Sequence, residues 1–532
     1  MTTMKRLLLF LALSGPPGAD NALLTLTGAS CVEELSEDEI QRFQSLAAHP
    51  VDLNLAGRSR LLATGLLSPF QVASLLDYRS RTGAVLSWSE LALVDGFNAR
   101  FVEALREFAV LGVPEGEAPG KREDLRFRQT LTLRGAWRPA EAAAWGVKYE
   151  AALGERAALY VSARTTLSDP RPGFPTLSAA YYGRRVLGQL VVGHFNARFG
   201  QGLVQWSGFQ LSGYSSLGAL RKNGTGFSPT GSHGASLLGV AADWHFGHWR
   251  LSTAYSWTGQ RPILNLTRTW RTVTAGLTAT REAASLEARV SLPGWSLFGE
   301  AAYAWRSGFS ALAGAYYVPS YGHRLGWLLR WYGPADKRYS GLAAGYEAPS
   351  FSATLDAGMR TDTRATQFKS VVQWQPGLSW RGVDFRPALR LAGRLRPGET
   401  APLRLELRGA LEAECGPWQL SGRLDLVRGR AWAWHWYAEA ARKQAKWAAY
   451  LRGGLFRVDD WDDRIYVYER DAPGSFTVPA RYGRGWAASF YLSGQLARSH
   501  SLWLRLETVQ YPWNLTQKES RTEVRLSYRY RL

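Results

Sequence analysis

Several features that define other protein classes are scarce in this sequence. Only two of the 532 residues are cysteine, and only three are methionine. Cys31 and Cys415 cannot form a disulfide framework in so long a chain, and neither has a metal-ligand neighbour at a useful spacing. The longest apolar run, Leu7 to Leu13, is too short to cross a bilayer as a helix. A mean hydropathy of -0.22 is also too polar for a helical membrane protein.

The apolar run near the N-terminus is typical of a signal peptide, because Lys5 and Arg6 precede it and small residues follow it. We expect the signal peptide to occupy residues 1–22. Its cleavage site stays open, since Ala12-Leu13-Ser14 leaves a short apolar core and cleavage at Ala19 puts a proline in a poor position. The chain is therefore expected to be exported.

The abundant residues favour a membrane-spanning β-barrel. Aromatic residues make up 13% of the chain, which has 23 Trp and 54 Gly. In such a barrel half of each strand faces water, and aromatic girdles mark both membrane interfaces. The net charge of +20 attracts polyanions such as nucleic acid or lipopolysaccharide. An arginine-rich genome that spreads arginine over solvated faces explains that charge equally well.

Residues 32–112 have helical periodicity and are expected to form a small all-α domain. Ser36 and Glu39 form a capping-box pattern at the start of a helix that Pro50 ends. Two helical pairs are expected after it, at residues 57–63 with 70–81 and at residues 87–93 with 99–108. Residues 113–124 are polar and rich in Pro and Gly, which indicates a linker.

The segment VDLNLAGRSRLLATGLLSPFQVASLLDYRSRTGAVLSWSELALVDGFNARFVEALREFAVL resembles the tandem helix-hairpin-helix domain of the bacterial competence DNA receptor. The shared features are Leu53-Asn54, Asp77-Tyr78-Arg79 and a glycine at each hairpin. In DNA-binding members a second hairpin glycine lets backbone N–H groups approach a phosphate. That glycine is missing from both hairpins here.

Two interpretations of this domain follow. It is either a protein-docking module that has lost DNA contact or a DNA-binding module. The candidate DNA-binding residues are Arg58, Arg60, Gly65, Ser68, Gly96, Asn98 and Arg100.

From residue 125 to 532 the periodicity changes to two, which predicts β-strands. Leucines at 403, 405, 407 and 411 alternate with charged residues at 404, 406, 408 and 412. Segments of this kind recur between turn residues, so we expect a large antiparallel transmembrane β-barrel of roughly 16–20 strands. The fold class is therefore an α+β multidomain chain, with a small helical domain followed by a barrel.

If the apolar residues face lipid, the alternating charged residues face the lumen. Acidic residues there are fewer than basic ones, so the lumen is expected to favour anions. The expected lumen-facing bases are Arg126, Arg128, Arg134, Arg386, Arg390, Arg394, Arg404, Arg408, Arg423, Arg505, Arg525, Arg529 and Arg531.

Two further stretches, FGQGLVQWSGF at 199–209 and DDRIYVYERDAPGSFTVPARYGRG at 462–485, extend the resemblance. Together with the helical domain they resemble a family of large outer-membrane barrels with N-terminal helix-hairpin-helix domains, typical of Bacteroidota. The resemblance implies an outer-membrane barrel with its helical domain in the periplasm.

Catalytic chemistry is not expected. No phosphate loop, nucleophile elbow or phospholipase-like pattern occurs in the sequence. His245 with His248, and the aspartates around Trp461, are more simply explained as solvated turns than as metal ligands. We therefore expect no enzyme, no cofactor and no metal site.

Three functional hypotheses remain open. The first is an envelope channel or transport component whose helical domain docks a periplasmic protein partner or a substrate. The second is a DNA-binding protein of DNA uptake, and the third is a structural or assembly-associated barrel with no conducting path. The expected partners are outer-membrane lipid and lipopolysaccharide, together with an anionic solute or DNA.

Overall fold

The computed structural model describes residues 17–29, 31–112 and 127–532, apart from short gaps. The gaps are at 140, 170, 184, 209–213, 233, 235, 271, 321, 334–338, 361–365, 381–382, 398, 400–401, 474 and 515–517. The expected linker at 113–124, Arg126 and residues 1–16 of the expected signal peptide lie outside the described residues.

The N-terminal region is helical, as predicted. Its elements are α2 (Pro17–Thr27), η1 (Val32–Glu34), α3 (Glu37–Ala48), α4 (Arg58–Thr64), α5 (Pro69–Thr82), α6 (Trp88–Leu91) and α7 (Ala99–Leu105). The capping box of Ser36 and Glu39 is formed at α3, and Ser87 and Glu90 form another at α6. Helix α2 runs past residue 22, the expected end of the signal peptide, and packs against α7.

The remainder of the chain forms a closed antiparallel barrel of 24 wall strands among the described residues. They are β3 (Phe127–Trp137), β4 (Ala144–Leu153), β5 (Ala157–Arg164), β6 (Thr176–Tyr182), β7 (Leu187–Arg198), β9 (Leu237–Phe246), β10 (Trp249–Ser256), β11 (Arg261–Thr269), β12 (Val273–Thr280), β13 (Ala283–Leu292), β14 (Trp295–Ala304), β15 (Gly308–Ser320), β16 (His323–Tyr332), β17 (Tyr339–Ala348), β18 (Phe351–Arg360), β19 (Thr366–Trp374), β21 (Val383–Leu395), β22 (Leu403–Cys415), β23 (Trp418–Arg428), β24 (Trp432–Lys443), β25 (Trp447–Val458), β28 (Gly483–Ala497), β29 (His500–Gln510) and β30 (Arg521–Arg531). The first and last strands, β3 and β30, pair with each other and close the ring.

Short strands supplement this wall. Strand β8 (Gly226–Pro229) pairs with β7, and β20 (Leu378–Trp380) pairs with β21. Strands β1 (Val51–Asp52) and β2 (Ala109–Val110) form a parallel pair in the helical region. The barrel therefore has more strands than the expected 16–20. Turns of only two residues, such as 247–248 after β9 and 293–294 after β13, explain the difference, because two neighbouring strands then look like one segment in the sequence.

The two ends of the barrel differ. Phe127, where β3 begins, and Leu532 lie at one end, because Gln129 and Leu532 are hydrogen bonded to each other. At this terminal end the connections between strands are mostly two to four residues long. At the opposite end, the loop end, two connections are much longer. They are the first inner loop, described at residues 199–208 and 214–225 after β7, and the second inner loop, described at residues 459–473 and 475–482 after β25.

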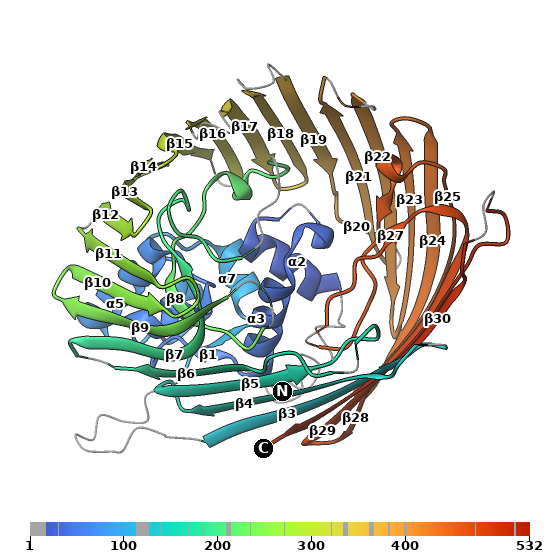
Figure 1. The fold of residues 1–532 in the computed structure, drawn as a ribbon, viewed down its shortest axis with the longest axis horizontal. Coiled ribbons are helices and arrows are strands. Elements are labelled where there is room, and N and C mark those ends of the chain that lie inside the picture. The colour runs from blue at the N-terminus through green and yellow to red at the C-terminus, as the bar shows by residue number, and fades with distance from the viewer. Residues whose placement is uncertain are drawn as a thin grey trace.

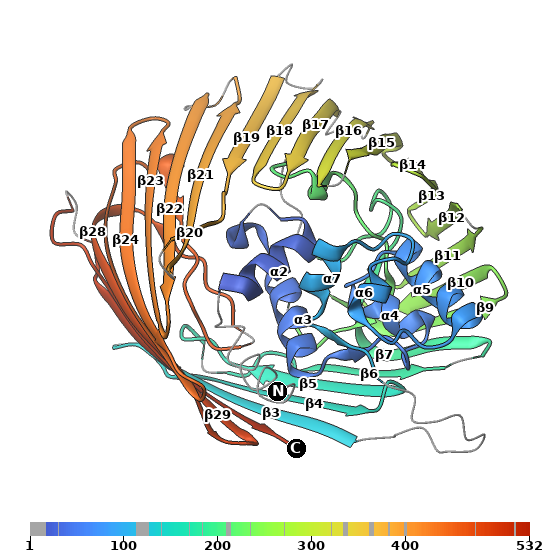
Figure 2. The ribbon, with the colours of Figure 1, turned by 180° about the vertical axis from the view of Figure 1, so that it is seen from behind.

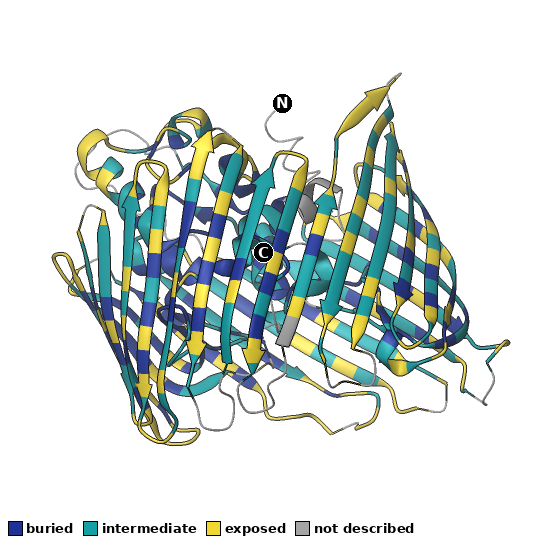
Figure 3. Cartoon of the chain, turned by 90° about the horizontal axis from the view of Figure 1, so that it is seen from above, coloured by how far each residue is buried: buried dark blue, intermediate teal, exposed yellow. Residues whose placement is uncertain are grey.

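The exterior of the wall is apolar. Exposed and less exposed positions alternate along the strands (Figure 3), and Leu389, Leu391 and Leu405 are each more than 40% exposed. Exposed tryptophans stand near both ends, namely Trp249, Trp270, Trp295, Trp374, Trp380, Trp418 and Trp447 at the terminal end and Trp137, Trp145, Trp257, Trp305, Trp331 and Trp432 at the loop end. A closed hydrogen-bonded ring with this exterior is suited to span a lipid bilayer.

No helix in the described part of the chain is long and apolar enough to cross a membrane.

The helical region lies inside the barrel, enclosed by the ring of strands (Figures 1 and 2). This corrects the expectation of a separate periplasmic domain. Helix α4 packs against β7 and β8 of the wall, and side chains of the region form hydrogen bonds with wall strands far along the chain. We call residues 17–29 and 31–112 the plug. The plug has its own apolar core, which includes Phe43, Leu105 and Phe108.

The facing of the wall strands is tested by two arginine substitutions on neighbouring strands. Leu405→Arg places a charge in lipid, which costs about 2–4 kcal/mol near the bilayer midplane. Ser421→Arg places the same side chain inside, opposite Glu412 and Glu439 on the adjacent strands. We expect the first change to reduce the folded, heat-modifiable band in a gel assay and the second to leave it intact. Equal tolerance of both changes contradicts the assigned facing.

Candidate functional site

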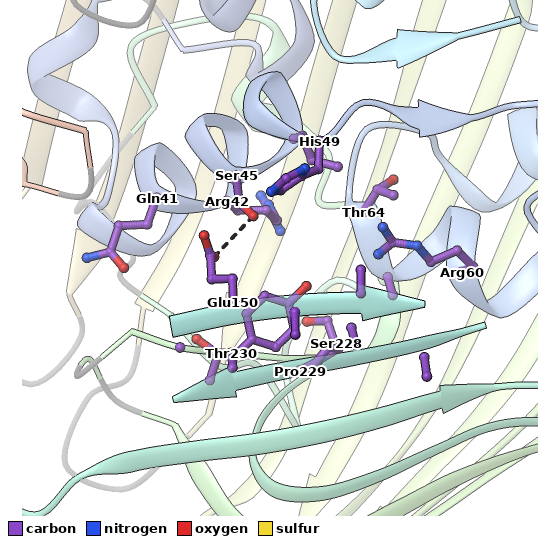
Figure 4. A pocket seen from close by; sticks show the side chains of 18 of the residues that line it. Gln41, Arg42, Ser45, His49, Arg60, Thr64, Glu150, Ser228, Pro229 and Thr230 are labelled. Atoms are coloured by element: carbon purple, nitrogen blue, oxygen red, sulfur yellow. Dashed lines mark hydrogen bonds between the residues drawn. The ribbon is translucent and has the colours of Figure 1, made fainter. Parts of the chain in front are cut away.

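The plug meets the wall along a polar seam near the terminal end (Figure 4). Ser45 Oγ donates to Glu150 Oε1 at 3.2 Å, and His49 Nε2 lies 2.8 Å from Thr130 Oγ1. Arg60 Nε donates to Glu155 Oε2 at 2.8 Å, and its pKa is raised because the carboxylate of Glu155 outweighs the effect of burial. A cavity of about 90 Å³ remains between these side chains. The seam therefore holds plug to wall by directional polar contacts.

Ser59 supplies another contact of the seam. Its Oγ lies 2.9 Å from His245 Nε2 of β9. His245 therefore lies in a strand and contacts the plug, which corrects the expectation of a solvated turn. The pKa of Arg58, which neighbours Ser59, is lowered by burial and by nearby Arg250.

The candidate DNA-binding residues are held mainly by contacts within the plug and with the wall. Ser68 caps α5, and Asn98 caps α7. Gly65 adopts a left-handed conformation with φ of 67°, and a Cβ there would lie 2.6 Å from Arg42 Nη1. Gly96, with φ of 86°, packs against Phe70 in the same way.

The charged members of that set also have wall neighbours. Arg60 pairs with Glu155, Arg58 lies beside Arg250, and Arg100 Nη1 lies 3.6 Å from Glu347 Oε1. The second helical pair is the more open one, since Leu86 and Leu93 are 74% and 86% exposed. Binding of protein or of DNA by this pair stays a prediction.

A second contact region joins the acidic start of the plug to the basic wall. Residues 31–39, CVEELSEDE, contain five acidic residues and no base. We call this segment the acidic tip. Its ion pairs with the wall are Glu33 with Arg408 and Arg423, Glu34 with Arg390, Glu37 with Arg164, and Asp38 with Arg198.

The electrostatics of the acidic tip keep its carboxylates ionised. Burial acts to raise the pKa of Glu33, but Arg408 and Arg423 lower it to about 2. Asp38 behaves similarly, because the effect of Arg198 exceeds that of burial and lowers its pKa. In contrast, burial beside Glu33 and Glu34 raises the pKa of the Cys31 thiol to about 12. The tip was missed in the sequence reasoning, although five acids in nine residues stand out in a chain of net charge +20.

The first inner loop folds into the lumen and joins the tip to the wall. Tyr214 N donates to Asp356 Oδ2 at 3.0 Å, and Tyr316 Oη donates to the Leu217 carbonyl at 2.8 Å. Ser215 donates to Glu34 of the tip. Gly218 and Gly28 touch backbone to backbone, so that a Cβ on Gly218 would lie 2.6 Å from Gly28 Cα.

The second inner loop closes on the tip from the other side. It contains η3 (Trp461–Asp463), β26 (Ile465–Tyr466) and β27 (Ala480–Arg481). Tyr468 N donates to Glu33 Oε1 at 3.4 Å, and Phe476 packs against the plug core. The two sequence stretches that extended the family resemblance are thus found in or next to these inner loops.

The aspartates around Trp461, expected in a solvated turn, instead help to fold the second inner loop. Asp459 pairs with Arg457 and Arg484, and Asp463 accepts hydrogen bonds from Arg430 N and Ala431 N. Their oxygens are therefore used in folding the loop and fixing it to the β23–β24 turn.

The structure places most of the expected lumen-facing arginines on the inner face with polar partners. Arg128 pairs with Glu155, Arg134 donates to the Pro473 carbonyl, and Arg529 donates to Thr132 Oγ1. The other printed pairs are Arg386 with Glu414, Arg390 with Glu34, Arg394 with Glu399, Arg404 with Glu406, Arg408 with Asp425, Arg423 with Asp425, Arg505 with Glu469, and Arg525 with Asp471. Arg531 lies near Arg529 and Glu150 at the seam.

A large chamber remains between the plug and strands β15–β22. Its volume is about 1440 Å³, and the acidic tip and both inner loops contribute to its lining. Tyrosine side chains line one part, and Arg330 stacks over Tyr214 and Tyr339 there. The basic side chains that line it are Lys222, Arg330, Lys369, Arg390, Arg394, Arg396, Arg404 and Arg464. The acidic ones are Glu34, Glu39, Asp356, Glu399, Glu406 and Asp462, which are fewer.

Comparison with known proteins yields structural matches only. No protein-family model and no curated protein matches the chain. The outer-membrane protein OpdK of Pseudomonas aeruginosa aligns with 76% of this chain and 99% of its own, at 12% identity and a TM-score of 0.33. OccK7 (OpdD) of the same organism aligns with 76% of this chain and 98% of its own, at 10% identity and 0.33. OccAB3 of Acinetobacter baumannii aligns with 76% of this chain and 99% of its own, at 10% identity and a TM-score of 0.32. The fold assignment rests on the strand pairing of this chain.

The contact between Gly28 and Gly218 is expected to depend on the absence of side chains. Gly218→Ala introduces a Cβ too close to the Gly28 backbone, and such overpacking typically costs about 1–3 kcal/mol. We expect faster hydrogen–deuterium exchange in residues 17–29 of this variant. Gly377→Ala is the matched control, because a Cβ there meets no atom within 4 Å. Unchanged exchange in the Gly218 variant contradicts the close approach.

The contact between the plug and the wall at His49 is expected to become less stable as the pH falls from about 6.5 to 4. Burial, with help from Arg531, lowers the pKa of His49 from 6.5 to about 4. The neutral imidazole therefore stabilises the plug in contact with the wall. This stabilisation is complete above pH 6.5 and is lost as the pH falls through 4. Protection factors from hydrogen exchange in α3 should fall over this window in the native chain. The His49→Gln chain should show a flatter profile, and a profile as steep as the native one excludes His49 as the cause.

Proposed function

We propose that the chain is a transport barrel of the bacterial outer membrane whose lumen is closed at rest by the plug. The observation that carries this proposal is the nature of the plug–wall contact. The plug has its own apolar core, and several hydrogen bonds and ion pairs join it to the wall. A hydrogen bond given up to water costs far less than its strength in isolation, because water takes the place of the lost partner. The plug can therefore shift while plug and wall both stay folded.

The shape of the barrel supports this location and orientation. Outer-membrane barrels have short periplasmic turns and longer extracellular loops. The terminal end, with its short turns, is then periplasmic, and both inner loops descend from the extracellular end. In this orientation the plug enters from the periplasm, and the acidic tip meets the inner loops deeper in the lumen. The plug and the inner loops together then separate the periplasmic side from the extracellular side of a path that runs through the chamber.

The proposed role is non-enzymatic and does not involve DNA uptake. The ionisable side chains of the lumen are largely engaged in contacts among the plug, the inner loops and the wall. Arg60 and Ser68 are two of the residues that DNA binding requires. Arg60 is paired with Glu155, and the Ser68 side chain caps α5.

Conductance across planar lipid bilayers tests the proposal. Replacing three acids of the tip with Glu33→Gln, Glu34→Gln and Asp38→Asn removes its ion pairs with the wall except that of Glu37 with Arg164. We expect the native chain to open rarely and the triple variant to open on the order of tenfold more often, since a 1.4 kcal/mol change in a two-state equilibrium is tenfold.

A control variant changes the same number of charges on the plug without touching the wall. Asp77→Asn, Asp95→Asn and Glu103→Gln are suitable, because all three residues are exposed and the printed ion pairs of Asp77 and Glu103 are within the plug. This control should open as rarely as the native chain. If both variants insert as folded barrels and neither conducts, a structural barrel without a conducting path is the better explanation.

A further inference from the structure

Three basic side chains of the chamber wall stand side by side on neighbouring strands. Lys369 of β19 is directly opposite Arg394 of β21, and Arg394 is directly opposite Arg404 of β22. All three line the chamber. Directly opposite residues have Cβ atoms about 4.5–5.5 Å apart, and like charges in such pairs are destabilising. The wall therefore holds a row of positive charges that repel one another.

Acidic groups near this row neutralise part of its charge. Glu406 pairs with Arg404, and Glu34 and Glu406 lie near enough to Lys369 to attract it electrostatically. Asp356 is opposite Lys369 in the register but is bound by Arg330 and by Tyr214 N. Glu399 lies 3.2 Å from Arg396, closer than its 3.6 Å distance from Arg394. The row is therefore only partly neutralised by the residues that the structure describes.

Two members of the row have donors available to a ligand. Arg404 is engaged, because it binds Glu406 and the Arg464 carbonyl. The Arg394 side chain is 34% exposed, and its Nη2 lies 3.6 Å from Glu399 Oε2, which is beyond hydrogen-bond distance. Lys369 forms neither a hydrogen bond nor an ion pair with the part of the chain that the structure describes. A planar guanidinium beside an ammonium group is well suited to bind a carboxylate or a phosphate.

The neighbouring positions show that this wall binds carboxylates. Arg390, four residues before Arg394 on the same face of β21, lies 3.4 Å from the carboxylate of Glu34. Arg408, opposite Arg390 on β22, contacts Glu33. The acidic tip thus occupies the inner part of the basic wall, whereas Lys369 and Arg394 border the open chamber.

We propose that Lys369 and Arg394 form a binding site for a small anionic solute, one that carries a carboxylate or phosphate group. The charges of Arg390 and Arg404 strengthen the attraction. The chamber of about 1440 Å³ exceeds the roughly 300–1,000 Å³ of typical small-molecule pockets, so an organic anion enters with part of its hydration. The phosphates of lipopolysaccharide lie outside the wall and do not reach it. The proposal rests on the transport function, because transport brings such a solute into the chamber.

Isothermal titration calorimetry on the full chain in a neutral detergent, free of lipopolysaccharide and at low salt, tests the site. The probes are inorganic phosphate and citrate. We expect the native chain to bind at least one of them and the Lys369→Gln, Arg394→Gln variant to bind on the order of 10- to 100-fold more weakly, as the loss of charge-assisted hydrogen bonds implies. Lys369→Gln alone should weaken binding without disturbing the fold, because it removes no hydrogen bond or ion pair between described residues.

Arg386→Gln is the matched control, because Arg386 lies on the same strand and face and pairs with Glu414 away from the row. It should bind as the native chain does, and a heat-modifiability gel verifies that each variant is folded. The site is refuted if the native chain binds neither probe, if the double variant binds equally well, or if the control loses as much affinity. These results are independent of conductance. Binding without any conducting state overturns the transport proposal alone, and conductance without binding overturns the anion site alone.

Discussion

The need to satisfy every backbone hydrogen bond in lipid is the constraint on which this structure depends. A wall strand exposed to hydrocarbon has no water to bind its N–H and C=O groups, so the sheet must close on itself. Pairing of β3 with β30 achieves that closure. A ring of 24 strands is wide, and side chains from the wall alone do not fill its lumen. The helical plug and the two inner loops occupy much of that space.

Closure also determines the chemistry of the lumen. Side chains alternate between the faces of a strand, so an apolar exterior requires a polar interior. Arginine supplies much of that interior here, and paired acids such as Asp425 and Glu439 neutralise part of it. The acidic tip supplies further carboxylates from a distant segment, for Glu33 and Arg423 are 390 residues apart in the chain. Electrostatic complementarity thus explains why a helical region of modest size is found inside the barrel.

Features that depend on short-range patterns could be predicted from the sequence. The alternation from Leu403 to Glu412 correctly gave a strand with leucine outside, and Ser36 with Glu39 correctly gave the start of α3. The strand number was underestimated because turns of two residues leave almost no polar gap. The position of the plug could not be predicted, since contacts such as Ser45 with Glu150 have no local signature. The inner loops were noticed only as familiar stretches, and their inward course follows from partners such as Asp356.

The same excess of inner-face arginine accounts for both the closed and the open parts of the lumen. Where carboxylates of the plug reach the wall, as Glu33 does at Arg408 and Arg423, the charges are matched and the space is filled. Farther along β19 and β21, Lys369 and Arg394 are adjacent and form no ion pair with the acidic tip among the described residues. Filling that region with apolar residues would bury unmatched cations, which is strongly unfavourable. The chamber therefore stays polar and open to water because its wall retains positive charge that the plug does not neutralise.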